Sequence, residues 1–132
     1  MKSLWQRRKR QAFTLIEIMI IVALIGLLAV LAIPSFIKDR KQSQGRRIVN
    51  DARQMDAAIN AWALETGQSD NAPIDTSSST GPVSYVKGGR WWNTDLLGNP
   101  YDFTQGVGSQ QILIAQDTKD ALAGVGIDWG PY

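Results

Sequence analysis

The sequence contains no cysteine and no histidine. Without cysteine the chain can form no disulfide, and it has no thiol to act as a nucleophile or as a metal ligand. Without histidine it lacks the commonest general base and the commonest ligand for transition metals. Aspartate, glutamate or lysine could still support catalysis, but the composition favours a protein that is not an enzyme. We also expect it to need no cofactor.

Acidic residues are absent from the first twelve positions, which hold five of the fourteen basic residues: Lys2, Arg7, Arg8, Lys9 and Arg10. The rest of the chain holds nine basic and twelve acidic side chains. The net charge of +2 therefore combines a basic leader with a body of net charge −3. Nucleic-acid binding by the body is not expected, because no basic patch there matches a phosphate backbone.

Polar residues are also absent from residues 18–33, which contain only Ile, Met, Val, Ala, Leu and Gly. The wider apolar segment runs from Phe13 to Ile37 and would span about 37 Å as an α-helix, enough to cross a bilayer core. A single-pass anchor and a secretory signal peptide both fit a basic leader followed by an apolar run. The signal peptide fits less well, because the run is long, no small-x-small cleavage site follows it, and a helical pattern continues beyond Pro34.

A third interpretation comes from the start of this segment, Ala12-Phe13-Thr14-Leu15-Ile16-Glu17. After a basic leader and before an apolar helix with a proline, this stretch resembles the prepilin signal of type IV pilins and type II secretion pseudopilins. The resemblance implies that a prepilin peptidase and N-methyltransferase cuts before Phe13 and methylates the new N-terminus. The family usually has glycine where Ala12 stands, and because glycine crowds a protease subsite least, we expect slower cleavage here.

Glu17 stands at the edge of the apolar segment, and an acid in a membrane segment is a candidate functional residue because its charge is costly there. It could be a hydrated carboxylate at the interface. The resemblance instead gives it a partner, the Phe13 amino group of its own or a neighbouring subunit, one helical turn away. Because an unpaired charge among apolar helices is strongly unfavourable, Glu17 would set the axial register of a filament.

The basic leader predicts the orientation, because positive residues that flank a span stay in the cytoplasm. We therefore expect a single-pass protein of the inner membrane, with a cytoplasmic N-terminus and a periplasmic head. The resemblance implies extraction into a periplasmic or extracellular homo-oligomeric filament. It also implies an inner-membrane assembly platform and membrane lipids as partners.

An amphipathic helix is predicted beyond Pro34. Apolar residues recur there at spacings of 4, 3, 4 and 3, at Ile48, Ala52, Met55, Ile59 and Trp62. The opposite face carries Arg46, Arg47, Asp51, Arg53 and Asn60. Gly67 is a candidate C-cap, so one helix is predicted from Phe13 to about Thr66. Pro34 would either kink it mildly or create a segment able to bend or melt during assembly.

An α+β fold is predicted overall, with a small antiparallel β head packed on the helix stripe. Residues 1–12 form the leader, 13–37 the transmembrane or filament-core helix, 38–67 the amphipathic helix and 68–132 the head. Within the head, residues 68–82 are predicted to be loop. Strands are predicted at 83–87, 98–103 and 110–115, the last two paired, and a helical turn at 118–123.

The head contains one further resemblance. Asp95-Leu96-Leu97-Gly98-Asn99-Pro100-Tyr101 resembles a D-P-x-G-N-P-Y pattern of major pseudopilins, with Leu96 where the pattern has proline. Gly98, Asn99, Pro100 and Tyr101 form a fold signature, because glycine and asparagine suit a positive φ and proline fixes the chain after the turn. The adjacent Trp91 and Trp92 are predicted to point to different sides, one into the core and the other to a subunit contact or a bound ligand.

Those pseudopilins often hold calcium in a C-terminal loop. The resemblance therefore makes Asp117, Asp120 and Asp128 candidate calcium ligands, since carboxylate oxygens suit this ion. The same acids are better explained as hydrated loop residues, since the family's ligand spacing is not clearly reproduced.

The sequence thus favours a structural subunit of a type IV pilus-like filament, most of all a type II secretion pseudopilin acting in protein export. A type IV pilus pilin for adhesion, motility or DNA uptake is the alternative within the family. A membrane-anchored binding module that forms no filament is the alternative outside it.

Overall fold

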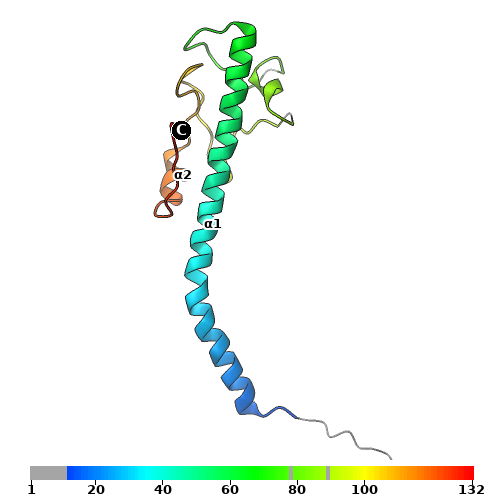
Figure 1. Cartoon of the computed structure of the whole chain (residues 1–132), viewed down its shortest axis with the longest axis vertical. Coiled ribbons are helices and arrows are strands. Elements are labelled where there is room, and N and C mark those ends of the chain that lie inside the picture. Colours follow the sequence, from blue (N-terminus) through cyan, green and yellow to red (C-terminus); the bar gives the residue numbers. More distant parts are fainter. Residues whose placement is uncertain (1–11, 78, 89) are drawn as a thin grey trace, which may run out of the picture. The chain divides into compact units, whose positions relative to one another are not determined.

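A computed structural model describes residues 12–77, 79–88 and 90–132. It contains the helix α1 (Leu15–Thr66), the 3-10 helix η1 (Pro82–Tyr85) and the short helix α2 (Gln116–Ala121), in this order (Figure 1). The chain divides after Ile37 into two units, a helical one and a larger compact one from Lys38 to Tyr132. The basic leader, residues 1–11, lies outside the described residues.

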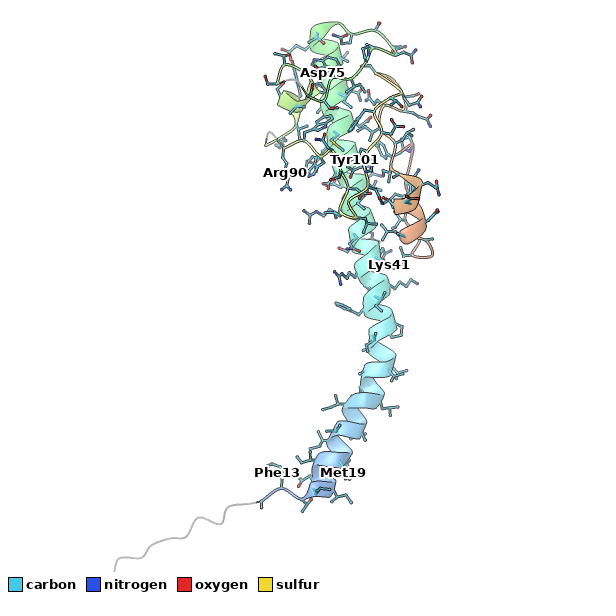
Figure 2. All side chains as sticks on the ribbon, turned by 180° about the vertical axis from the view of Figure 1, so that it is seen from behind. Phe13, Met19, Lys41, Asp75, Arg90 and Tyr101 are labelled. Carbon is cyan, nitrogen blue, oxygen red and sulfur yellow. The ribbon has the colours of Figure 1, made fainter. Side chains whose placement is uncertain are left out.

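The first unit is an apolar helix without a cover of its own. α1 contains a segment long and apolar enough to cross a membrane, and none of that segment is buried. Figure 2 shows the side chains of Phe13 and Met19, which are 73% and 61% exposed. The core helix of a water-soluble domain would instead be covered by other elements. This segment therefore needs lipid or other protein chains around it.

The predicted long helix is confirmed. It begins at Leu15, two residues later than expected, continues through Pro34 and ends at Thr66. Gly67 follows with a φ of 69°, the left-handed conformation of a helix C-cap, and the Gln68 amide donates to the Ala63 carbonyl at 2.9 Å. How far Pro34 weakens the helix stays a prediction.

The second unit has its core along one stripe of α1. All five predicted stripe residues are buried, Ile48, Ala52, Met55 and Ile59 completely and Trp62 almost so. Side chains from the segments after α1 complete the cluster: Tyr101, Val107, Ile112, Ile114, Leu122 and Tyr132. Figure 1 shows α2 alongside α1, with η1 on the other side of it. The head is thus packed around the outer part of α1, as the stripe predicts.

The prediction of an exposed polar face is wrong for one residue, Asp51. Arg46, Arg47, Arg53 and Asn60 are exposed, but Asp51 is buried, with only 8% of its surface accessible. The helix pattern alone did not predict this, because the chain that covers Asp51 returns from a distant part of the sequence.

The predicted β-rich head is wrong, since the described residues contain no β-strand. Two isolated antiparallel bridges occur instead, between Thr94 and Pro100 and between Asp102 and Leu113. The second bridge joins the two segments that were predicted to pair, through reciprocal backbone hydrogen bonds of 3.0 and 2.9 Å. The pairing was therefore predicted correctly, and its extension into a ladder was not.

Local chemistry explains why neither bridge extends. Pro100 has no amide hydrogen to donate to a ladder. The Asp102 carboxylate accepts a hydrogen bond from the Thr104 amide at 2.8 Å, which turns the chain just after the bridge. On the other side, α2 begins at Gln116, three residues after Leu113. The predicted strand at 83–87 is replaced by η1, which Pro82 starts. The predicted helical turn at 118–123 is present as α2, two residues earlier.

Candidate assembly determinants of the helix and the head

The predicted cleavage site lies before α1. Ala12 and Phe13 are exposed and not helical, and Thr14 immediately precedes the helix. Exposed backbone outside regular structure is where proteolysis concentrates. The bond between Ala12 and Phe13 is therefore accessible in the single chain, as cutting requires.

Thr14 is a helix-capping residue that our sequence reasoning missed. Its hydroxyl and carbonyl oxygens accept hydrogen bonds from the Glu17 amide at 3.3 and 3.1 Å. This is one half of a Thr-x-x-Glu capping box, in which the side chain of the residue before the helix accepts a hydrogen bond from the amide of the third helical residue. The signal was present, because a threonine three residues before a glutamate marks a helix start.

Glu17 therefore occupies the first turn of α1. A carboxylate there is favoured by the positive end of the helix dipole. The acid that stands at the edge of the apolar run thus also marks where the helix begins. The pairing of Glu17 with a Phe13 amino group stays a prediction, since it needs the cut chain.

The turn signature of the head forms a hydrogen-bonded link to α2. One Asp95 carboxylate oxygen accepts from the amides of Leu97 and Asn99 at 2.8 and 3.0 Å. The other accepts from the hydroxyl of Thr118, which is completely buried. The side-chain nitrogen of Asn99 donates to the same hydroxyl at 2.8 Å. Gly98, with a φ of 90°, permits the turn. Gly98, Asn99 and Asp95 therefore act in folding.

Tyr101 follows this turn and is buried among aromatic rings. Its ring centroid lies 6.5 Å from that of Phe103, which in turn lies 5.4 Å from that of Trp91. Burial, with smaller contributions from Asp51 and Asp95, raises the pKa of Tyr101 far above its usual value. The phenol therefore stays neutral, and its oxygen has no hydrogen-bond partner among the described residues.

The predicted division of roles between the two tryptophans is not seen. Trp91 and Trp92 are both partly buried, and both pack against the core cluster. Both also line a hollow of about 380 Å³, together with Arg47, Asp51 and Arg90. Burial raises the pKa of Asp51, and the positive charges of Arg47 and Arg90 offset only part of that rise.

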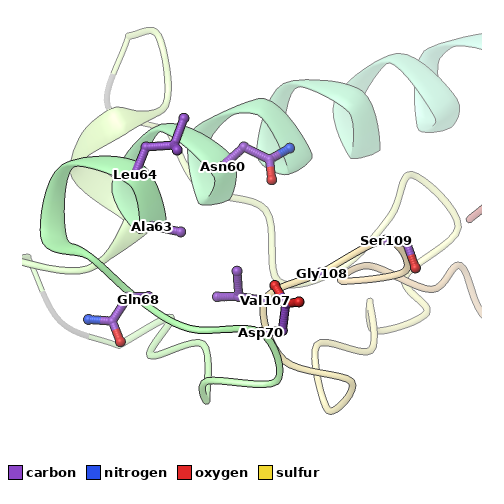
Figure 3. Close-up of a pocket in the computed structure, with 8 residues that line it drawn as sticks. All are labelled: Asn60, Ala63, Leu64, Gln68, Asp70, Val107, Gly108 and Ser109. Atoms are coloured by element: carbon purple, nitrogen blue, oxygen red, sulfur yellow. The ribbon is translucent and has the colours of Figure 1, made fainter.

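A second hollow lies at the end of α1 (Figure 3). Its volume is about 520 Å³, and it is lined by Asn60, Ala63, Leu64, Gln68, Asp70, Val107, Gly108 and Ser109. Leu64 is 86% exposed. Among the described residues that line this hollow, Asp70 has the only titratable side chain.

Gln111 was also missed by sequence reasoning. It is buried, and its side-chain nitrogen donates to the Asp56 carboxylate at 2.8 Å and to the Asn60 side chain at 3.0 Å. The Gln111 side chain thereby holds the segment before α2 against α1. Because these partners lie more than fifty residues apart, no local pattern could have identified them.

The three candidate calcium ligands are not gathered by the fold. Among the described residues, no group of three or more acidic side chains is placed to hold a metal ion. Asp120 accepts a hydrogen bond from Gln116 at 2.9 Å, and Asp128 accepts one from the Gly130 amide at 3.0 Å. Asp117 lies in the first turn of α2. Calcium binding by these acids stays a prediction without a preformed ligand group.

Comparison with known proteins agrees with the N-terminal features. Residues 7–33 match the family model of the prokaryotic N-terminal methylation motif. The chain is 27% identical to the type II secretion system core protein G of Aeromonas hydrophila, over 96% of the chain and 95% of that protein. It is 38% identical to the type IV major fimbrial protein FimA of Dichelobacter nodosus, over 76% of the chain and 60% of that protein.

A further relative is similar over a shorter range. The type IV major pilin protein PilA of Myxococcus xanthus is 45% identical, over 46% of the chain and 23% of that protein. No solved structure matches the chain significantly. These relatives agree with three features of the chain: the exposed segment before α1, the acid in its first turn and its apolar helix. The chain therefore carries a prokaryotic N-terminal methylation motif, and it is similar to type II secretion core proteins and to type IV pilins.

Proposed function

We propose that this protein is a structural subunit of a type IV pilus-like filament. The observation that carries the proposal is the apolar segment of α1, which is fully uncovered in the single chain and is preceded by a methylation motif. A helix that is apolar all round can be stable in lipid or among copies of itself. Exchange of the first environment for the second is what filament assembly from a membrane requires.

Within this family, a role in a type II secretion pseudopilus is favoured. The relative named as a type II secretion core protein aligns over nearly the whole of both chains. The fimbrial protein and the pilin are more similar per residue, but 40% or more of each lies outside the alignment. The alignment with the secretion protein therefore includes the head. A surface pilin is the second candidate, because of the identity to FimA.

The processing and topology that we propose follow from the same features. The leader would remain in the cytoplasm and the head would lie outside it. A prepilin peptidase would cut before Phe13 and methylate the new amine. Glu17 would then pair with that amine, and an inner-membrane platform would extract the subunit. The protein's work would be mechanical, without a catalytic site.

The test is the mass of the mature N-terminus. The chain is expressed together with a prepilin peptidase, purified from membranes and analysed by mass spectrometry. We expect N-methylated Phe13 as the first residue, and Ala12→Gly should increase the processed fraction. A chain that keeps its leader in the presence of an active peptidase, in both forms, would favour a plain membrane anchor instead.

A further inference from the structure

The turn of α1 that follows the apolar segment carries a concentration of positive charge. Lys38, Arg40 and Lys41 occur within four residues, and Asp39 is the only acid among them. Lys38 and Arg40 are exposed and Lys41 is half-buried; Figure 2 shows Lys41 projecting from the helix. The first α1 residue that the head buries is Gly45. These three cations, here called the collar, therefore lie on a turn that the head leaves largely uncovered.

The position of the collar matches the headgroup layer of a bilayer. The interfacial region adds roughly 5 to 8 Å to each side of the hydrocarbon core. At about 1.5 Å per residue, the residues from Lys38 to Gln42 span this layer when Ile37 marks the edge of the core. Lysine and arginine side chains are long enough to place their charges among headgroups while the helix crosses them.

In the proposed register, α1 of a neighbouring copy would offer the collar no negative partner. The proposed pairing of Glu17 with the amine of a neighbouring Phe13 would offset adjacent subunits by about four residues of helix. The residues then level with the collar are Gln42 to Gly45 on one side and Pro34 to Ile37 on the other, and none of them is acidic. Beyond Asp39, the next acid on α1 is Asp51.

We propose that the collar binds the headgroups of anionic phospholipids, such as phosphatidylglycerol, in the leaflet on the side of the head. Each basic residue near an anionic surface strengthens such binding, and the effect is screened by salt. This contact would hold the subunit in the membrane until assembly, since it is lost on extraction. The inference rests on the proposed membrane insertion and register of α1.

The test uses the full chain in phosphatidylcholine vesicles that contain spin-labelled phosphatidylglycerol or, separately, spin-labelled phosphatidylcholine. The fraction of each probe that the protein immobilises gives its preference. One variant neutralises the collar with Lys38→Gln, Arg40→Gln and Lys41→Gln. A matched control neutralises three cations farther along α1 with Arg46→Gln, Arg47→Gln and Arg53→Gln. Arg46 begins about 13 Å beyond Ile37, outside the headgroup layer, and the leader is the same in all chains.

We expect the wild-type chain to prefer phosphatidylglycerol by at least about fivefold, since each basic residue near an anionic surface contributes about this much. Neutralising the collar should reduce this preference to less than about half, and the control variant should retain it. Salt at about 1 M should abolish the wild-type preference. No preference in the wild type, or an equal loss in both variants, would overturn the inference. This measurement needs no filament. A chain without lipid preference would therefore leave the proposed filament role intact. A chain that forms no filaments could still show the lipid preference.

Discussion

At the scale of single residues, Glu17 is the side chain on which assembly should depend most. We expect Glu17→Ala to leave membrane insertion unchanged, because the variant makes the segment more apolar, and to abolish filament formation, because the register pair is lost. Sedimentation of sheared filaments measures assembly, and carbonate extraction of membranes measures insertion. Thr14→Val is the control for the helix start, since it removes the capping hydroxyl and keeps the acid. Normal filaments from Glu17→Ala would refute the role of this residue.

Thr118 should be one of the most sensitive polar residues of the head. Thr118→Val removes the hydroxyl that bonds to one Asp95 carboxylate oxygen and to the Asn99 side-chain nitrogen, and both atoms lose this partner. We expect a loss of about 1–3 kcal/mol of folding free energy, seen as a lower melting temperature in detergent. Thr94→Val, at an exposed position before the same turn, should change it by less than about 0.5 kcal/mol. Equal effects of the two changes would contradict this account of the turn.

Asp51 predicts a pH dependence of stability. Since burial raises its pKa in the folded state above the ordinary value of 3.8, the folded chain binds more protons than the unfolded chain just above that pH. Stability should therefore fall as the pH rises through this range, and ionised Asp51 is unfavourable at pH 7. Asp51→Asn should raise the melting temperature at pH 7 but not below about pH 4. The exposed Asp39→Asn should do neither, and a lower melting temperature for Asp51→Asn at pH 7 would show that Arg47 and Arg90 outweigh burial.

At the scale of elements, the packing of the C-terminal segment on α1 depends on a glycine. A Cβ at Gly45 would overlap the side chain of Ile127. Gly45→Ala should therefore destabilise the head by about 1–3 kcal/mol through overpacking, in spite of about 1 kcal/mol gained in helix propensity. Adding Ile127→Ala should recover much of the loss, which a double-mutant cycle measures. Stabilisation by Gly45→Ala alone would show that the segment is not held at this position.

The elements differ in how far the sequence predicts them. α1 was predictable almost to the residue, because its apolar run, its stripe from Ile48 to Trp62 and its C-cap at Gly67 are local patterns. The head was not, because an Asx turn at Asp102 and the missing amide of Pro100 limit each extended segment to a single bridge. Burial of Asp51 and Gln111 depends on contacts with distant segments, which periodicity does not report.

At the scale of the whole molecule, the methylation motif was predictable because it is a linear motif, and the roles of its residues stay predictions. Phe13 and Glu17 were identified from a short stretch that the methylation-motif match covers. Thr14 was overlooked although its spacing to Glu17 carried the signal. The calcium ligands, by contrast, were chosen from residue type alone, and the fold does not gather them.

The central claim is that the uncovered helix exchanges lipid for copies of itself. The most direct measurement is to express the chain with a complete and active export apparatus, shear the cells and identify the protein in sedimented filaments by electron microscopy and mass spectrometry. We predict filaments built of the chain that begins at methylated Phe13. A chain that stays monomeric in the membrane under these conditions would contradict the account.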